Sequence, residues 1–111
     1  MPKRFWRNEV IQFALDRDVE EAKAEQRAIL ARDPRNSHAH HALGTLAHFR
    51  GQTEQAIQLF SKAIELNTDS PAPHVSLGRL YALRGEYELA WKHARAAASL
   101  GQRELVELLE R

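Results

Sequence analysis

The stretch HHALGTLAHFRG, residues 40–51, has a close copy further along the chain in HVSLGRLYALRG, residues 74–85. Six of the twelve letters agree in order, and each matching residue lies 34 positions from its partner. Extended without a gap, residues 37–70 and 71–104 share ten identical positions, most of them small or apolar. A fixed period between roughly 20 and 50 residues is typical of stacked-repeat proteins, so this chain is predicted to consist of repeats.

Each period carries the pattern of two helices. Leu43, Leu46 and Phe49 recur at helical spacing in the first half of one period. The second half has the same spacing at Ala56, Leu59, Phe60, Ala63 and Ile64. Gly51 and Gly85 lie between the halves, where a tight turn needs a residue that tolerates positive φ. Because no alternating strand pattern occurs, the predicted fold class is all-α.

The composition limits the classes of function. The 111 residues are 43% hydrophobic and 28% charged, as in a soluble globular domain. Lys and Arg total 16 against 15 Asp and Glu, which disfavours nucleic acid as the main ligand. The absence of cysteine excludes disulfides and cysteine-based zinc sites. No apolar stretch suits a membrane span or a secretory signal, so the default expectation is a cytoplasmic protein without membrane contact.

The order of Leu-Gly, small alanines and aromatic residues resembles the signature of the tetratricopeptide repeat (TPR) family. The residues that carry this resemblance are Trp6, Leu43, Gly44, Ala56, Phe60, Ala63, Leu77, Gly78, Tyr81, Ala90 and Ala97. The resemblance implies antiparallel helix pairs stacked as a right-handed α-solenoid. It divides one domain, 1–111, into a degenerate repeat at 3–36, repeats at 37–70 and 71–104, and a terminal helix at about 102–110. In the degenerate repeat Arg17 replaces the turn glycine, and Asp18 is expected to open a second helix.

The resemblance also implies a function, because TPR proteins bind partner segments along the first helices of their pairs. The positions that match this groove are Arg7, Ile11, His38, His41, Thr45, His48, Val75 and Arg79. Arginine forks suit carboxylates, so the expected ligand is a peptide or helical segment of a partner protein, and an acidic one is favoured. The chain is thus interpreted as a protein-interaction adaptor without cofactor, and not as an enzyme.

Self-assembly is the alternative interpretation. The apolar residues that would carry it lie near the two ends of the chain: Phe5, Trp6, Leu105, Leu108 and Leu109. RNA binding has weaker support from the arginines alone. A metal site is disfavoured, because the three histidines of the predicted groove spread over almost three helical turns. His40 and His74 match the family's tryptophan position and are expected to pack inside the helix pairs.

Overall fold

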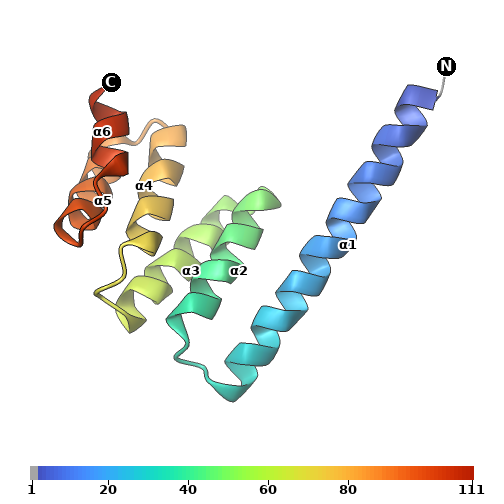
Figure 1. Ribbon diagram of the computed structural model, residues 1–111, viewed down its shortest axis with the longest axis horizontal. Coiled ribbons are helices and arrows are strands. Elements are labelled where there is room, and N and C mark those ends of the chain that lie inside the picture. Colours follow the sequence, from blue (N-terminus) through green and yellow to red (C-terminus); the bar gives the residue numbers. More distant parts are fainter. Residues whose placement is uncertain (1–2) are drawn as a thin grey trace.

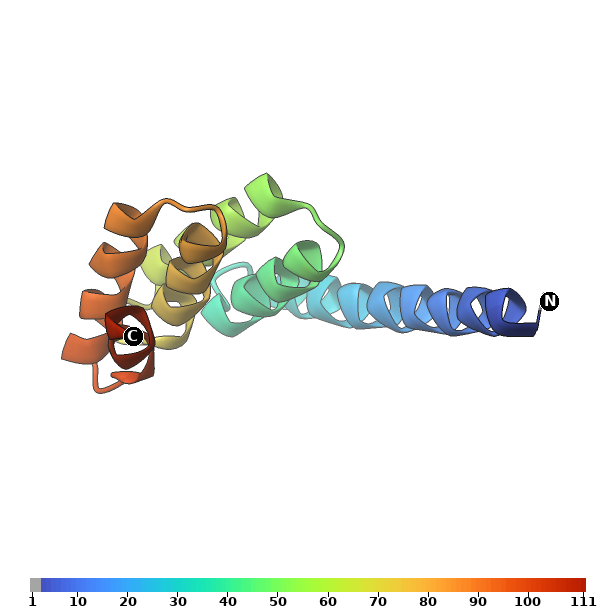
Figure 2. The same ribbon diagram turned by 90° about the horizontal axis from the view of Figure 1, so that it is seen from above.

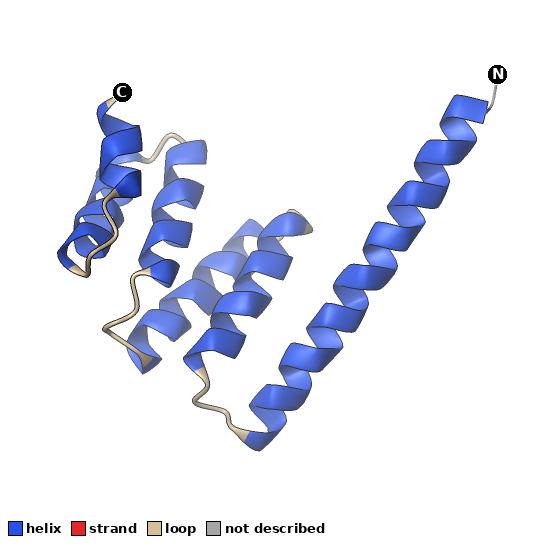
Figure 3. Cartoon of the chain, viewed as in Figure 1, coloured by secondary structure: helices blue, strands red, loops and turns tan. Residues whose placement is uncertain are grey.

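A computed structural model describes the backbone of residues 3–111 and the side chains of residues 16–111. Its helices are α1 (Lys3–Arg32), α2 (Ser37–Phe49), α3 (Thr53–Leu66), α4 (Ala72–Leu83), α5 (Tyr87–Ser99) and α6 (Glu104–Glu110). The described part contains no strand, as Figure 3 shows. The helices form a repeat solenoid, which confirms the predicted all-α class.

Glycine makes the turns within the helix pairs. Gly51 and Gly85 both have φ of 77°, in the left-handed region that other residues avoid. Gly51 N–H donates a hydrogen bond to the carbonyl oxygen of His48, and Gly85 N–H donates to that of Ala82. These bonds satisfy carbonyl groups that the helix ends would leave unpaired. The two pairs α2–α3 and α4–α5 therefore close in the same way.

Small residues bring the helices of a pair close together. A Cβ atom added to Gly44 would lie 2.6 Å from Cε1 of Phe60 on α3, and one added to Gly78 would lie 3.3 Å from the carbonyl oxygen of Ala90 on α5. The Gly78 Cβ would also collide with Leu105 of α6. The alanines that face these contacts from the second helices are fully buried: Ala56, Ala63, Ala90 and Ala97. Any larger side chain at these positions would force the helices apart.

The second helix of each pair also packs on the helix that follows it. In Figure 1, α3 lies beside α4 and α5 beside α6, and α1 lies beside α2 in the same manner. One ion pair repeats with this arrangement. Arg50 Nη2 lies 2.8 Å from Glu20 Oε1, and Arg84 Nη1 lies 2.8 Å from Glu54 Oε1. The C-terminal half of α1 therefore occupies the place of a second helix.

The expected helix pair within residues 3–36 is wrong. The stretch forms one helix of 30 residues, which runs past Arg17 and Asp18 without a turn and extends as a straight rod in Figure 2. The reason is local: residues 3–32 contain neither Gly nor Pro, and Arg17 stands where the later pairs have a positive-φ glycine. An L-residue with a side chain resists that conformation, so the helix continues.

Candidate binding surfaces

The predicted groove residues on α2 and α4 fall into an exposed set and a packed set. His38, Thr45 and His48 on α2 and Arg79 on α4 are exposed. Their spacing places the α2 residues on one helical face, which we call the inner face together with Arg79. Neither α2 nor α4 contains an Asp or a Glu. The inner face therefore presents hydrogen-bonding groups and a guanidinium without an acid on its own helices.

His41 joins the two helices through a hydrogen bond, and Val75 is buried. The Nε2 atom of His41 lies 2.9 Å from Oγ of Ser76, and its ring centroid lies 5.3 Å from that of Phe60. Burial, followed by the nearby His38, lowers the pKa of His41. Val75 is only 8% exposed. Val75 is one of the positions that match the family's groove, but its side chain is buried within the solenoid.

Two large apolar side chains at the edge of the inner face were missed by the sequence prediction. Phe49 at the end of α2 is 58% exposed, and Leu83 at the end of α4 is 77% exposed. They occupy the same position in successive repeats, one residue before the Arg-Gly that ends each first helix. That repeated apolar-Arg-Gly triplet was the available signal. Large exposed apolar side chains that recur at one position of each repeat are typical of interaction surfaces.

The terminal residues predicted for self-association have different environments. Leu105 on α6 is 1% exposed and packs over Gly78, so little of its side chain is available to another chain. Leu108 is 52% exposed, and Leu109 is partly buried. The side chains of Phe5, Trp6, Arg7 and Ile11 lie outside the described residues, so those four predictions remain untested.

Histidines form polar contacts to the α1–α2 loop and within the α4–α5 pair. His40 Nε2 lies 3.1 Å from the carbonyl oxygen of Pro34, and His74 Nδ1 lies 3.0 Å from Nδ1 of His93. The His93 ring also stacks on Tyr81 at a centroid distance of 5.8 Å. Burial, followed by His74 and Lys92, lowers the pKa of His93 from 6.5 to about 4. Among the side chains of residues 16–111, no three His, Asp or Glu residues are grouped to hold a metal ion.

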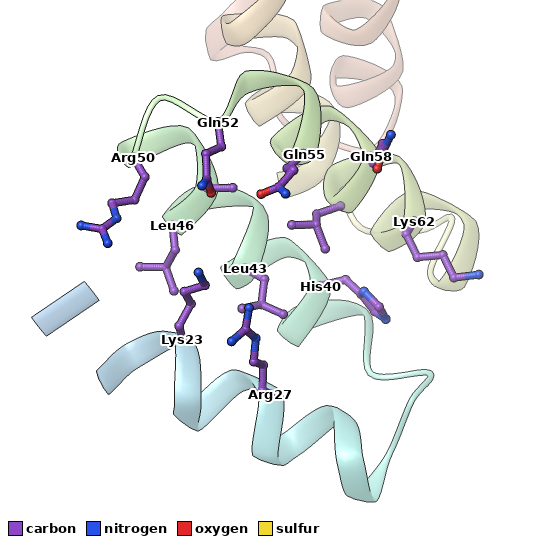
Figure 4. Close-up of a pocket in the computed structure, with 12 residues that line it drawn as sticks. Lys23, Arg27, His40, Leu43, Leu46, Arg50, Gln52, Gln55, Gln58 and Lys62 are labelled. Carbon is purple, nitrogen blue, oxygen red and sulfur yellow. The ribbon is translucent and has the colours of Figure 1, made fainter. Parts of the chain in front are cut away.

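A cleft of about 510 Å³ lies on the other side of α2, between α1 and α3 (Figure 4). Its residues come from α1, α2, α3 and the turn between the last two: Lys23, Arg27, His40, Leu43, Leu46, Ala47, Arg50, Gln52, Gln55, Gln58, Leu59 and Lys62. The floor is apolar and the walls are basic or amide-bearing. No residue of this cleft was singled out as a binding residue from the sequence.

Over the described helices, none is long and apolar enough to cross a membrane.

Comparisons with known proteins agree with this repeat architecture. Residues 46–85 match a family model described as TPR repeat, and residues 27–58 match one described as tetratricopeptide repeat. No curated protein matches the chain. A chain of the solved CopN–Scc3 complex is similar at 27% identity and a TM-score of 0.68, over 93% of this chain and 62% of that one. This protein thus spans less than two thirds of that chain's length.

The helix pairs, the repeated signature residues and the matching family models confirm the predicted resemblance to tetratricopeptide repeat proteins. Repeats of this kind are modules of protein–protein interaction and are not catalytic. The chain belongs to the tetratricopeptide repeat family.

Proposed function

We propose that this protein holds an acidic segment of a partner protein across the inner face of α2 and α4. The main support for this proposal is the charge distribution on α2 and α4. The two helices have an exposed arginine, Arg79, and contain no Asp or Glu. A guanidinium can bind a carboxylate through two parallel hydrogen bonds, which gives both affinity and orientation. That the similar solved chain comes from a complex supports a protein as the partner.

The edge of the inner face supplies the apolar part of the proposed contact. Leu83 lies one helical turn after Arg79, and Phe49 lies one turn after Thr45, so each helix offers a polar position followed by an apolar one. A partner segment with carboxylates beside large apolar side chains would match both the polar positions and the apolar positions of the two helices. Burial of one such side chain contributes roughly 1.5–3 kcal/mol, which is offset in part by ordering the segment.

The test is a selection of short random peptides displayed on phage. Wild type is compared with Arg79→Glu and with Lys92→Glu, a matched charge reversal at an exposed position of α5. From wild type and the Lys92 variant we expect peptides that combine acids with large apolar residues and that shift the amides of Thr45 and Arg79 in ¹⁵N-labelled protein, and we expect Arg79→Glu to lose these inner-face peptides. Equal recovery of inner-face peptides by all three proteins, or inner-face peptides without an acidic bias, would contradict the proposal.

Self-association is the second candidate function, and the exposed Leu108 on α6 favours it. Sedimentation velocity over a range of protein concentrations tests it directly. A mass that rises with concentration for wild type but not for Leu108→Ser would support assembly through α6. A constant monomer mass would remove this candidate and leave partner binding unaffected.

A further inference from the structure

The cleft between α1 and α3 has a counterpart one repeat further along the chain. We call α1, α2 and α3 the first layer, and α3, α4 and α5 the second layer. In the second layer the floor is closed, because Leu77 is 1% and Leu80 is 2% exposed. In the first layer the matching residues are more open: Leu43 is 9% exposed, and Leu46 is only partly buried.

Differences at matching positions explain why one layer is closed and the other open. Tyr81 on α4 stacks over His93 on α5, and it packs against the buried core. The position that matches Tyr81 in the first layer is Ala47, a much smaller residue that lines the cleft together with Leu59. The cleft walls differ likewise: Ile57 is replaced by Lys23, Ser61 by Arg27 and Leu89 by Gln55.

The charged residues that line the cleft are all basic. Its twelve lining residues include Lys23, Arg27, Arg50 and Lys62 and no acid. Arg50 is engaged by Asp16 and Glu20 of α1, and Lys62 lies 3.6 Å from Glu65. Within the described part, Lys23 and Arg27 form no ion pair, and Figure 4 shows both reaching from α1 towards the cleft. They are the cations left to meet a ligand.

We propose that this cleft is a second docking site, which binds an acidic amphipathic segment of a partner protein. One large apolar side chain of that segment lies on Leu46 and Ala47, in the space that Tyr81 occupies in the second layer. Its carboxylates pair with Lys23 and Arg27. This goes beyond the proposed function, because the cleft residues and the inner face lie on opposite sides of α2.

The apolar floor decides between a protein segment and another polyanion. Nucleic-acid binding depends mainly on neutralising phosphates, and it does not require leucines beneath the cations. A peptide helix or strand can supply apolar and acidic side chains together, and the glutamines of α3 can bond to its polar groups. The observed lining therefore favours a protein segment.

The experiment uses the whole chain and two synthetic peptides with the same apolar residues on one face. The probe peptide carries Glu on its polar face, and the control peptide carries Lys. Amide chemical shifts of ¹⁵N-labelled protein are followed during each titration. We expect the Glu peptide to shift the amides of Leu46, Ala47 and Leu59 in a saturable way, and the Lys peptide to leave them in place.

Three variants separate this cleft from the inner face. Ala47→Tyr fills the cleft as in the second layer, and Lys23→Gln with Arg27→Gln removes its available cations. Each is expected to weaken binding of the Glu peptide by about tenfold or more. Arg79→Glu, on the inner face, is expected to leave the cleft shifts unchanged. Thermal unfolding followed by circular dichroism verifies that every variant is folded.

Several results would overturn the docking site. These are an absence of saturable cleft shifts, equal binding by Ala47→Tyr and wild type, or equal shifts with the Lys peptide. Tighter binding of single-stranded RNA than of the Glu peptide at the same amides would assign the cleft to nucleic acid instead. A concentration-dependent dimer that Ala47→Tyr abolishes would make a second copy of the chain the occupant. Loss of inner-face binding alone would affect only the first proposal.

Discussion

The first and second layers share one backbone plan but use it differently. Both have a glycine and an alanine where the helices of a pair meet, and both have an Arg–Glu ion pair between the end of the first helix and the second helix that precedes it. They differ at the surface between the second helices, where Tyr81, Leu77 and His93 close one layer and Ala47 leaves the other open. The fold thus depends on the glycine and alanine residues between paired helices, and the surface positions between second helices can differ and serve for binding.

The largest expected difference between the layers is in their floor leucines. Leu77→Ala should lower the free energy of unfolding by about 3 kcal/mol, because it leaves a cavity in a closed core. Leu43→Ala should cost about 2 kcal/mol or less, because water can enter the open cleft beside it. Urea denaturation of both variants measures the difference. An equal cost would mean that the two layers are packed alike.

Exchanging the residues at the matching positions 47 and 81 should make the first layer closed and the second layer open. Tyr81→Ala is expected to cost about 2 kcal/mol, since the ring packs on the core and on His93. Ala47→Tyr is expected to stabilise the chain by about 1 kcal/mol, since its ring can cover Leu59 and displace water from the cleft. Thermal unfolding tests both changes. Destabilisation by Ala47→Tyr would show that the cleft lacks room for the ring.

The second layer should also be the more sensitive to acid. An unfolded histidine binds a proton near pH 6.5, whereas His93 in the fold binds one only near pH 4. The unfolded chain therefore binds more protons between these values, and the stability present above pH 6.5 is lost as the pH falls toward 4. His93→Leu, which copies Leu59 of the first layer, should flatten this dependence.

Urea midpoints measured from pH 7.5 down to the acid range provide the measurement. Part of the acid sensitivity should remain in His93→Leu, because burial also lowers the pKa of His41 and His74. An identical pH profile for wild type and the variant would show that His93 does not carry the effect.

The smallest expected effects concern the repeated ion pairs. A double-mutant cycle on Glu20 with Arg50 should give about 0.2–1 kcal/mol, because Glu20 is 55% exposed. A cycle on Glu54 with Arg84 should give a smaller coupling, because Glu54 is 77% exposed. Both couplings should decrease in high salt. We expect the Glu20 pair to be the stronger, since Arg50 and Glu20 are 30% and 55% exposed, against 40% and 77% for Arg84 and Glu54. A stronger Glu54 pair would contradict this order.

The sequence predicted the features that depend on local pattern. The period, the glycine turns and the small residues between paired helices were all readable, because each is required by backbone geometry at a fixed spacing. The burial of Val75 and Leu105 was not predicted, since periodicity shows which residues share a face but not which neighbouring helix covers it. The cleft was missed for the same reason, because it depends on how α1 packs beside α2 and brings Lys23 and Arg27 next to Ala47.

Because α1 lies at one end of the stack of helices, molecules with α1 attached and molecules with α1 detached can be distinguished as two states. Within the described part, α1 packs against α2 and no other helix. Its attachment is therefore an equilibrium of its own, distinct from global unfolding. The cleft exists only while α1 is attached, so any occupant of it shifts that equilibrium. A ligand at 100 times its Kd would favour the attached state by about 2.7 kcal/mol, and occupancy would thus set how many molecules hold α1 in place.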